Sequence, residues 1–153
     1  MCSEPGTFRS EDQPRAAGRH VGESRVGRRI LLAEDDSSFR YLLAALLRRD
    51  GYQVVSVATG VDLMDLLFDS LSKDSPVPGF DLVLSDIRMP GWPGLDALSS
   101  LRYVPGMPPL ILFTAFGDPE TRWRAREIGA LALLDKPFDL DEMRRLVAKA
   151  LGS

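Results

Sequence analysis

The sequence of 153 residues contains one cysteine, one histidine and no long apolar segment. With Cys2 alone, the chain can form no internal disulfide and offers no thiolate cluster for a metal ion. His20 stands in a polar N-terminal stretch, where a lone histidine is most often simply hydrated. No apolar run reaches the ~18 residues that span a bilayer, and the N-terminus lacks a signal-peptide core. We therefore expect a soluble cytoplasmic protein without a membrane partner.

The charge is also low, with a formal net value of −3. This value argues against nucleic acid or a charged membrane surface as the main partner. Residues 1–27 are rich in Gly, Ser, Pro and mixed charge, and they cannot bury enough apolar area to offset their ordering entropy. We predict a flexible tail over 1–27 and a single domain over 28–153.

The predicted domain alternates short apolar runs with segments of helical spacing. The expected strands are residues 28–34, 52–58, 80–85, 109–114 and 131–134. Five helices are expected. Three of them are indicated by apolar residues at helical spacing: the first by Phe39, Leu42, Leu43, Leu46 and Leu47, the second by Met64, Leu67, Phe68 and Leu71, and the fifth by Leu140, Met143, Val147, Ala150 and Leu151. The third and fourth helices are expected over residues 94–104 and 118–130. Five strand–helix units in sequence predict an α/β fold, with a doubly wound parallel sheet covered by helices on both faces.

Charged and polar residues follow four of the five predicted strands. They are Glu34, Asp35 and Asp36 after the first strand, Asp86 after the third, Thr114 at the end of the fourth, and Asp135 and Lys136 after the fifth. Ligands bind beyond the carboxyl ends of strands in such sheets. Two carboxylates ~4 Å apart repel by about 4 kcal/mol at an effective dielectric of 20, so the acids require a counter-charge. Mg²⁺ with oxygen ligands, together with Lys136, would suit an anionic phosphoryl group.

Each of these residues also has an ordinary structural interpretation. Asp36 precedes a helix and is better explained as its N-cap. Thr114 at a strand end is unremarkable by itself, and a Lys-Pro step commonly follows a strand. The functional interpretation is favoured because all of these residues fall at one edge of the predicted sheet.

Four stretches carry a resemblance to a known family: "ILLAEDDSSFR", "DLVLSDIRMPGWPGLDAL", "LILFTAFGD" and "GALALLDKPFDLDEM". Together they resemble the receiver domain of two-component response regulators over essentially all of residues 28–151. The spacing also fits, because Thr114 lies 28 positions (114 − 86) and Lys136 50 positions (136 − 86) after Asp86. The resemblance implies a flavodoxin-like five-stranded sheet in the order 2-1-3-4-5.

The resemblance also implies roles for single residues. Asp86 would be the phosphoacceptor, forming an aspartyl phosphate. Glu34, Asp35, Asp86 and the backbone carbonyl of Arg88 would hold Mg²⁺.

Two further residues would respond to the phosphoryl group. The ammonium group of Lys136 would form an ion pair with it, and the Lys136–Pro137 peptide bond would be cis. The hydroxyl of Thr114 would swing towards it and pull the following loop. The protein would thus be a signalling phosphoacceptor rather than an enzyme with a separate substrate.

The resemblance implies partners as well. The donor would be a sensor histidine kinase or a histidine phosphotransfer protein, because His20 lacks the helical bundle of a phosphotransfer domain. Only Gly152 and Ser153 follow the fifth predicted helix, so we expect a receiver that stands alone or is excised from a longer protein, with no output domain and no direct DNA binding in this chain. The output protein would dock on the fourth helix, which carries Arg122, Trp123, Arg124 and Arg126; an ordinary solvated basic helix explains these four residues equally well. A homodimer through this region is a further expectation.

Three features depart from the family pattern. Leu133 stands three positions before Lys136, where many relatives have an aromatic residue that rotates on activation. Arg88 and Phe116 occupy the positions two beyond Asp86 and Thr114, and their bulk would screen the phosphoryl group from water. The connection over residues 69–79 is longer than usual.

Three rival functions remain open at this stage. A phosphatase of the haloacid-dehalogenase type needs a second aspartate at the position of Arg88, which argues against it. A flavin or nucleotide binder needs a Gly- or Ser-rich loop after the first strand, whereas this chain has "EDDSS", which repels phosphate. The third rival is an interaction module that retains the receiver fold but acts without phosphorylation.

Overall fold

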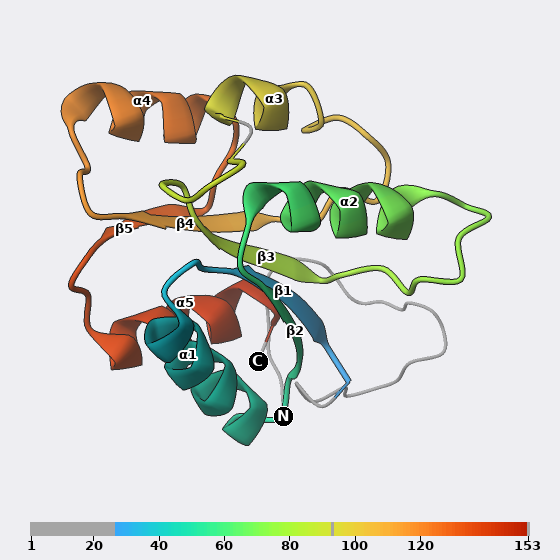
Figure 1. Ribbon diagram of the computed structural model, residues 1–153, viewed down its shortest axis with the longest axis horizontal. Coiled ribbons are helices and arrows are strands. Elements are labelled where there is room, and N and C mark those ends of the chain that lie inside the picture. The colour runs from blue at the N-terminus through green and yellow to red at the C-terminus, as the bar shows by residue number, and fades with distance from the viewer. Residues whose placement is uncertain (1–26, 93, 153) are drawn as a thin grey trace.

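The computed structural model describes residues 27–92 and 94–152. Five parallel strands form one sheet in the order β2-β1-β3-β4-β5, as expected (Figure 1). The strands are β1 (Arg29–Ala33), β2 (Gln53–Val57), β3 (Leu82–Asp86), β4 (Leu110–Thr114) and β5 (Ala132–Asp135). The central strands β3 and β4 are buried along their whole length, because helices cover both faces of the sheet.

Five helices form the two outer layers. They are α1 (Ser37–Arg49), α2 (Gly60–Leu71), α3 (Leu95–Ser99), α4 (Pro119–Glu127) and α5 (Leu140–Ala150). Helices α1 and α5 cover one face of the sheet, and α2, α3 and α4 cover the other (Figure 1). A separate apolar core lies on each side of the sheet, so the doubly wound fold predicted from the sequence is confirmed.

Two helices begin at aspartate caps that the sequence indicated. The Asp36 carboxylate accepts a hydrogen bond from the backbone N–H of Phe39 at 3.0 Å. Asp118 accepts one in the same way from Thr121 at 2.8 Å. These bonds satisfy backbone donors that have no partner inside the helix, and they fix where α1 and α4 begin.

The third helix is shorter than predicted. The sequence indicated residues 94–104, but α3 covers only Leu95–Ser99 and is followed by turns. Its N-cap, Gly94, provides no side-chain hydrogen bond. At the other end the Ser100 hydroxyl donates to the carbonyl of Ala97 at 2.7 Å, a local bond that competes with helix continuation.

Two residues assigned to apolar helix faces are exposed. Leu42 of α1 is 42% exposed and Phe68 of α2 is 53% exposed. In α2 the fully buried positions are Leu63 and Leu67, so the face that packs on the sheet is rotated relative to the prediction.

The first residue of α2 lies directly against the loop between β3 and α3. The Gly60 N–H donates to the carbonyl of Pro90 at 2.8 Å. A Cβ atom at Gly60 would overlap the carbonyl group of Gly91. We expect Gly60→Ala to lower the free energy of unfolding by about 1–3 kcal/mol, because backbone must move to make room.

Urea denaturation would measure this effect, with Gly79→Ala as the matched control. A Cβ atom at Gly79 would meet no described atom within 4 Å. Equal stabilities of the two variants would contradict the close approach of α2 to this loop.

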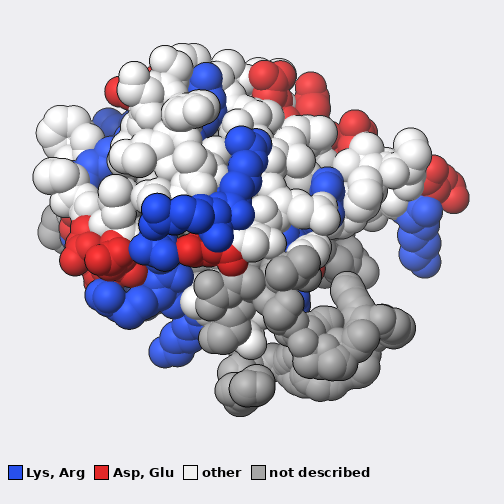
Figure 2. All heavy atoms as spheres, turned by 90° about the horizontal axis from the view of Figure 1, so that it is seen from below, with Lys and Arg blue, Asp and Glu red and all other residues white. Residues whose placement is uncertain are grey.

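The predicted tail over residues 1–27, with Cys2 and His20, lies almost entirely outside the described residues. Within the described ranges, no helix combines the length and apolar character required to cross a bilayer. On the face shown in Figure 2, basic and acidic side chains alternate in small groups instead of forming a field of one sign.

Candidate functional site

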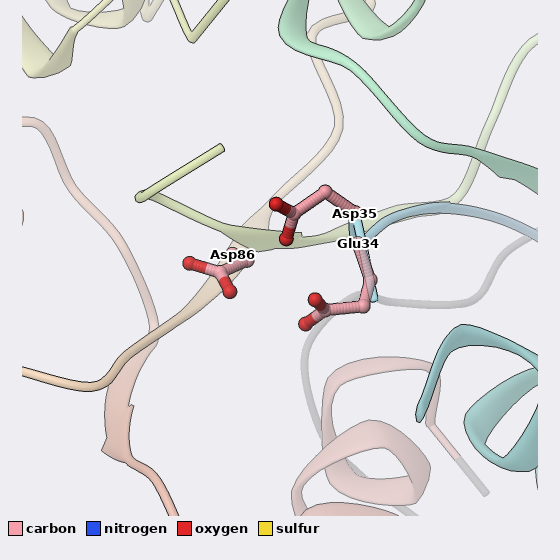
Figure 3. Close-up of side chains that lie close together, drawn as sticks. All are labelled: Glu34, Asp35 and Asp86. Carbon is pink, nitrogen blue, oxygen red and sulfur yellow. The ribbon is translucent and has the colours of Figure 1, made fainter. Parts of the chain in front are cut away.

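Acidic side chains from the ends of β1 and β3 converge at one edge of the sheet. The strands are in register with Ala33 opposite Ser85, so Glu34 and Asp86 follow at neighbouring positions. The carboxylates of Glu34, Asp35 and Asp86 point into the same space (Figure 3). One oxygen of each lies within 4.8 Å of the others. Glu34 is fully buried, Asp86 is 3% exposed and Asp35 is exposed.

Lys136, at the end of β5, bridges the two buried acids. Its ammonium group donates to Glu34 Oε1 at 2.8 Å and to Asp86 Oδ2 at 2.5 Å. Burial raises the pKa of Glu34 above its usual value, against the lowering effect of the Lys136 hydrogen bond. Burial alone would lower the pKa of Lys136, but its bonds to Asp86 and Glu34 outweigh this effect and raise it. The cation therefore stays charged and compensates the buried acids.

An aromatic wall, formed by Phe39, Phe113 and Phe138, lies beside the Lys136 ammonium group. The nitrogen is 5.2 Å from the ring centre of Phe39 and 5.6 Å from that of Phe113. The Phe113 and Phe138 rings pack 5.5 Å apart. The negative faces of the Phe39 and Phe113 rings favour a cation at this position. No pattern in the sequence indicated this wall, although each phenylalanine lies within five residues of a predicted site residue.

Thr114 ends β4 on the same edge and is fully buried. Its hydroxyl accepts a hydrogen bond from the backbone N–H of Phe116 at 3.1 Å, and its carbonyl accepts one from the N–H of Lys136 at 2.8 Å. Within the described residues, no hydrogen bond joins Thr114 to Asp86. The predicted residues are thus brought to one edge, but the threonine is bound to its own loop in this conformation.

Arg88 and Phe116 lie two residues beyond Asp86 and Thr114, and their side chains contact each other. The Arg88 N–H donates to Asp86 Oδ1 at 2.7 Å, which ties the loop after β3 to the acid. The exposed Arg88 guanidinium lies 5.1 Å from the centre of the Phe116 ring. This contact links the loop after β3 to the loop after β4. The Lys136–Pro137 bond is cis, as the resemblance implied.

The donor set fits a hard divalent cation. Glu34, Asp35 and Asp86 offer only carboxylate oxygens, and few protein ligands with room for water suit Mg²⁺. The exposed Asp35 gives the site an open side. Because Lys136 already contacts two of the three acids, a metal ion would share them with the ammonium group.

Two of the three arginines on α4 are already paired with acids of this chain. Arg122 forms an ion pair with Asp135, and Arg124 forms one with Asp96. Trp123 is 57% exposed. The arginines therefore present less free positive charge to a partner than the sequence suggested.

The family model described as "Response regulator receiver domain" matches residues 30–148. The chain therefore belongs to the response regulator receiver family of two-component signalling, whose members are signalling phosphoacceptors with an acidic Mg²⁺ pocket. Receiver domains interact with histidine kinases or phosphotransfer proteins.

Individual relatives agree with this assignment. Sporulation initiation phosphotransferase F of Bacillus subtilis is 32% identical over 126 residues, which are 82% of this chain and 95% of that protein. Transcriptional regulatory protein PdtaR of Mycobacterium tuberculosis is 36% identical over 122 residues, 79% of this chain but only 55% of that protein. Among solved structures, the response regulator protein TrrA of Thermotoga maritima in complex with Mg(2+)-BeF is 28% identical. The superposition covers 81% of this chain and 98% of the TrrA chain, with a TM-score of 0.66.

Proposed function

We propose that Asp86 accepts a phosphoryl group from a phosphohistidine of a sensor histidine kinase or histidine phosphotransfer protein. The observation that carries the proposal is the Lys136 bridge, in which one ammonium group contacts two buried acids from different strands. A partly buried cation between two buried acids is costly as a purely structural feature, because replacing such pairs by apolar residues is often neutral or stabilising. Perturbed, clustered ionisable groups in one place support a functional site.

The reaction is a transfer between two nucleophiles. A carboxylate oxygen of Asp86 attacks phosphorus, the new O–P bond forms, and the N–P bond of the donor breaks. The donor histidine, protonated at its other ring nitrogen, leaves with the electron pair of the N–P bond and is released as neutral imidazole. Lys136 lies 2.5 Å from the Asp86 oxygen and can follow the negative charge onto the phosphoryl oxygens.

Glu34, Asp35, Asp86 and the backbone carbonyl of Arg88 are the proposed ligands of Mg²⁺. When bound, the ion would supply charge neutralisation for the phosphoryl oxygens. The protein contributes the rigid placement of the ligands, since Glu34 also accepts a hydrogen bond from the Asp36 N–H at 2.9 Å.

Thr114 would then transmit the presence of the phosphoryl group to the loop that follows β4. Thr114 directly precedes the loop before α4, and the hydrogen bond of its hydroxyl in this structure is to the Phe116 N–H of that loop. A new bond from this hydroxyl to the phosphoryl group would shift the populations of two loop conformations. An output protein, or a second copy of the chain, would recognise the altered α4 region around Trp123.

Intact-protein mass spectrometry tests the phosphoacceptor role. We expect incubation with acetyl phosphate to add one phosphoryl mass in Mg²⁺ and none in EDTA. Hydroxylamine should remove it, because an acyl phosphate is labile to this nucleophile and a phosphoserine is not. Fragmentation after borohydride reduction should place the modification within β3.

An unmodified mass in saturating Mg²⁺, also with several phosphohistidine donors, would contradict the proposal. That result would favour the interaction module that keeps the fold without phosphorylation.

A further inference from the structure

The loop that follows Thr114, residues 115–118, is fastened to β5 by one side chain of α4. The Arg122 Nε donates to the carbonyl of Gly117 at 3.1 Å, and its Nη2 pairs with the Asp135 carboxylate. We call these three residues, Gly117, Arg122 and Asp135, the Arg122 clamp. One guanidinium therefore holds the backbone of the loop and the last residue of the neighbouring strand together.

The absence of a side chain at Gly117 is part of the clamp. A Cβ atom there would overlap the Asp135 carboxylate, and it would also lie 3.0 Å from Arg122 Nη2. The acid thus packs directly against the loop backbone, in a space that any other residue would fill. A residue with a Cβ atom at 117 would force the Asp135 carboxylate away from the loop and so disturb the clamp.

Asp135 connects the clamp to both response residues of the site. It is the register partner of Thr114 across the β4–β5 ladder, and it immediately precedes Lys136. The Lys136 N–H donates to the Thr114 carbonyl at 2.8 Å. A shift of the loop therefore has to break or carry the Arg122–Asp135 contact at the point where β4 and β5 meet the site.

We propose that the Arg122 clamp holds the loop after Thr114 in its resting conformation and so sets the threshold for activation. Arg122 and Asp135 are positioning residues, which act through Thr114 and the loop. This inference rests on the proposed phosphoacceptor function. The Thr114 hydroxyl stays on the Phe116 N–H while the clamp is closed, and opening of the clamp frees the loop to follow it towards Asp86.

The strength of the clamp is appropriate for a switch. The Arg122 and Asp135 side chains are 43% and 46% exposed, and exposed ion pairs contribute only modestly. A contribution of that size hardly affects folding but changes the ratio of two loop conformations several-fold. Leu133, two residues earlier on β5, is apolar and forms no comparable polar link to the loop.

Binding of beryllofluoride, a tetrahedral phosphoryl mimic, tests the clamp. We expect Arg122→Met and Asp135→Asn each to bind beryllofluoride in saturating Mg²⁺ about fivefold more tightly than the wild type. The reason is that the resting conformation of the loop has lost the Arg122–Asp135 ion pair that stabilises it. In the free variants, the NMR amide signal of Gly117 should move part of the way towards its beryllofluoride-saturated position. Arg122→Lys, which retains the ion pair, should restore most of the wild-type behaviour.

Arg145→Met is the matched control, since it removes an exposed guanidinium from α5 that has no ion pair among the described residues. It should leave the affinity unchanged. The double variant Arg122→Met/Asp135→Asn should bind no more tightly than either single variant, because both remove the same contact.

The outcomes separate the two proposals. If the wild type binds beryllofluoride and the clamp variants bind it equally or less tightly, the clamp is overturned and the proposed function stands. If the wild type does not bind it in Mg²⁺, both proposals fail.

Discussion

Asp86→Asn is expected to abolish phosphoryl uptake while leaving the protein folded. Asparagine has the volume of aspartate, and its carbonyl oxygen can still accept the Arg88 N–H that now lies 2.7 Å from Asp86 Oδ1. The amide is no nucleophile, so no acyl phosphate can form. Its NH₂ group would face the Lys136 ammonium, donor against donor, in place of the present 2.5 Å contact. Lys136 keeps Glu34 as a partner.

The measurement is the stoichiometry of phosphorylation by acetyl phosphate in Mg²⁺, read from the intact mass. Asp81→Asn is the matched control, because it makes the same chemical change at the opposite end of β3, where Asp81 binds the Arg29 N–H. This control should take up phosphoryl like the wild type. Hydroxylamine-sensitive phosphorylation of Asp86→Asn would show that another carboxylate is the acceptor.

Lys136→Met should have the largest effect on stability, as a loss whose size depends on pH. The substitution leaves Glu34 fully buried without its cation, and loss of one partner of such a pair costs about 3–5 kcal/mol. The pKa of Glu34, already raised by burial, should rise further because the lowering effect of Lys136 disappears.

The sign of the pH dependence follows from that shift. An acid whose pKa is higher in the folded than in the unfolded protein contributes stability at low pH, and this is lost as the pH rises through the folded value. Relative to the wild type, the loss in free energy of unfolding caused by Lys136→Met should therefore be small below pH 4.5, the ordinary pKa of a glutamate, and large at neutral pH. Urea denaturation in EDTA from pH 4 to pH 8 measures it. Lys149→Met, at an exposed position in the last turn of α5, is the control.

The same substitution should strengthen Mg²⁺ binding and weaken phosphorylation. Removing the ammonium group leaves two acids to the metal alone, so calorimetric titration should show a lower dissociation constant. Phosphoryl transfer should slow, because the fixed cation that meets the phosphoryl oxygens is gone. Tighter Mg²⁺ binding with faster phosphorylation, or weaker Mg²⁺ binding with slower phosphorylation, would contradict a lysine that competes for the acids and assists the transfer.

Much of the fold could be predicted because the governing signals are local. Short apolar runs between stretches of helical spacing indicated all five strands, and the Asp36 and Asp118 caps marked two helix starts correctly. The third helix was predicted too long because its end depends on weak helix formers and turns near Ser100. The exposure of Phe68 was also missed, since helical spacing shows which residues share a face but not how that face is rotated on the sheet.

By itself, the sequence determined the order of strands and helices, the acids and the lysine at the strand ends, and the spacing of Thr114 and Lys136 from Asp86. These features depend on residue type and position along the chain. Only the tertiary structure decided that Lys136 contacts both Glu34 and Asp86, that the rings of Phe39 and Phe113 flank it, and that Arg122 is paired with Asp135. Lys136 is 102 positions from Glu34, and parallel pairing of β1, β3, β4 and β5 brings such distant residues to one edge. Side-chain contacts across that edge depend on the packing of residues that are far apart in the chain, which local sequence patterns do not encode.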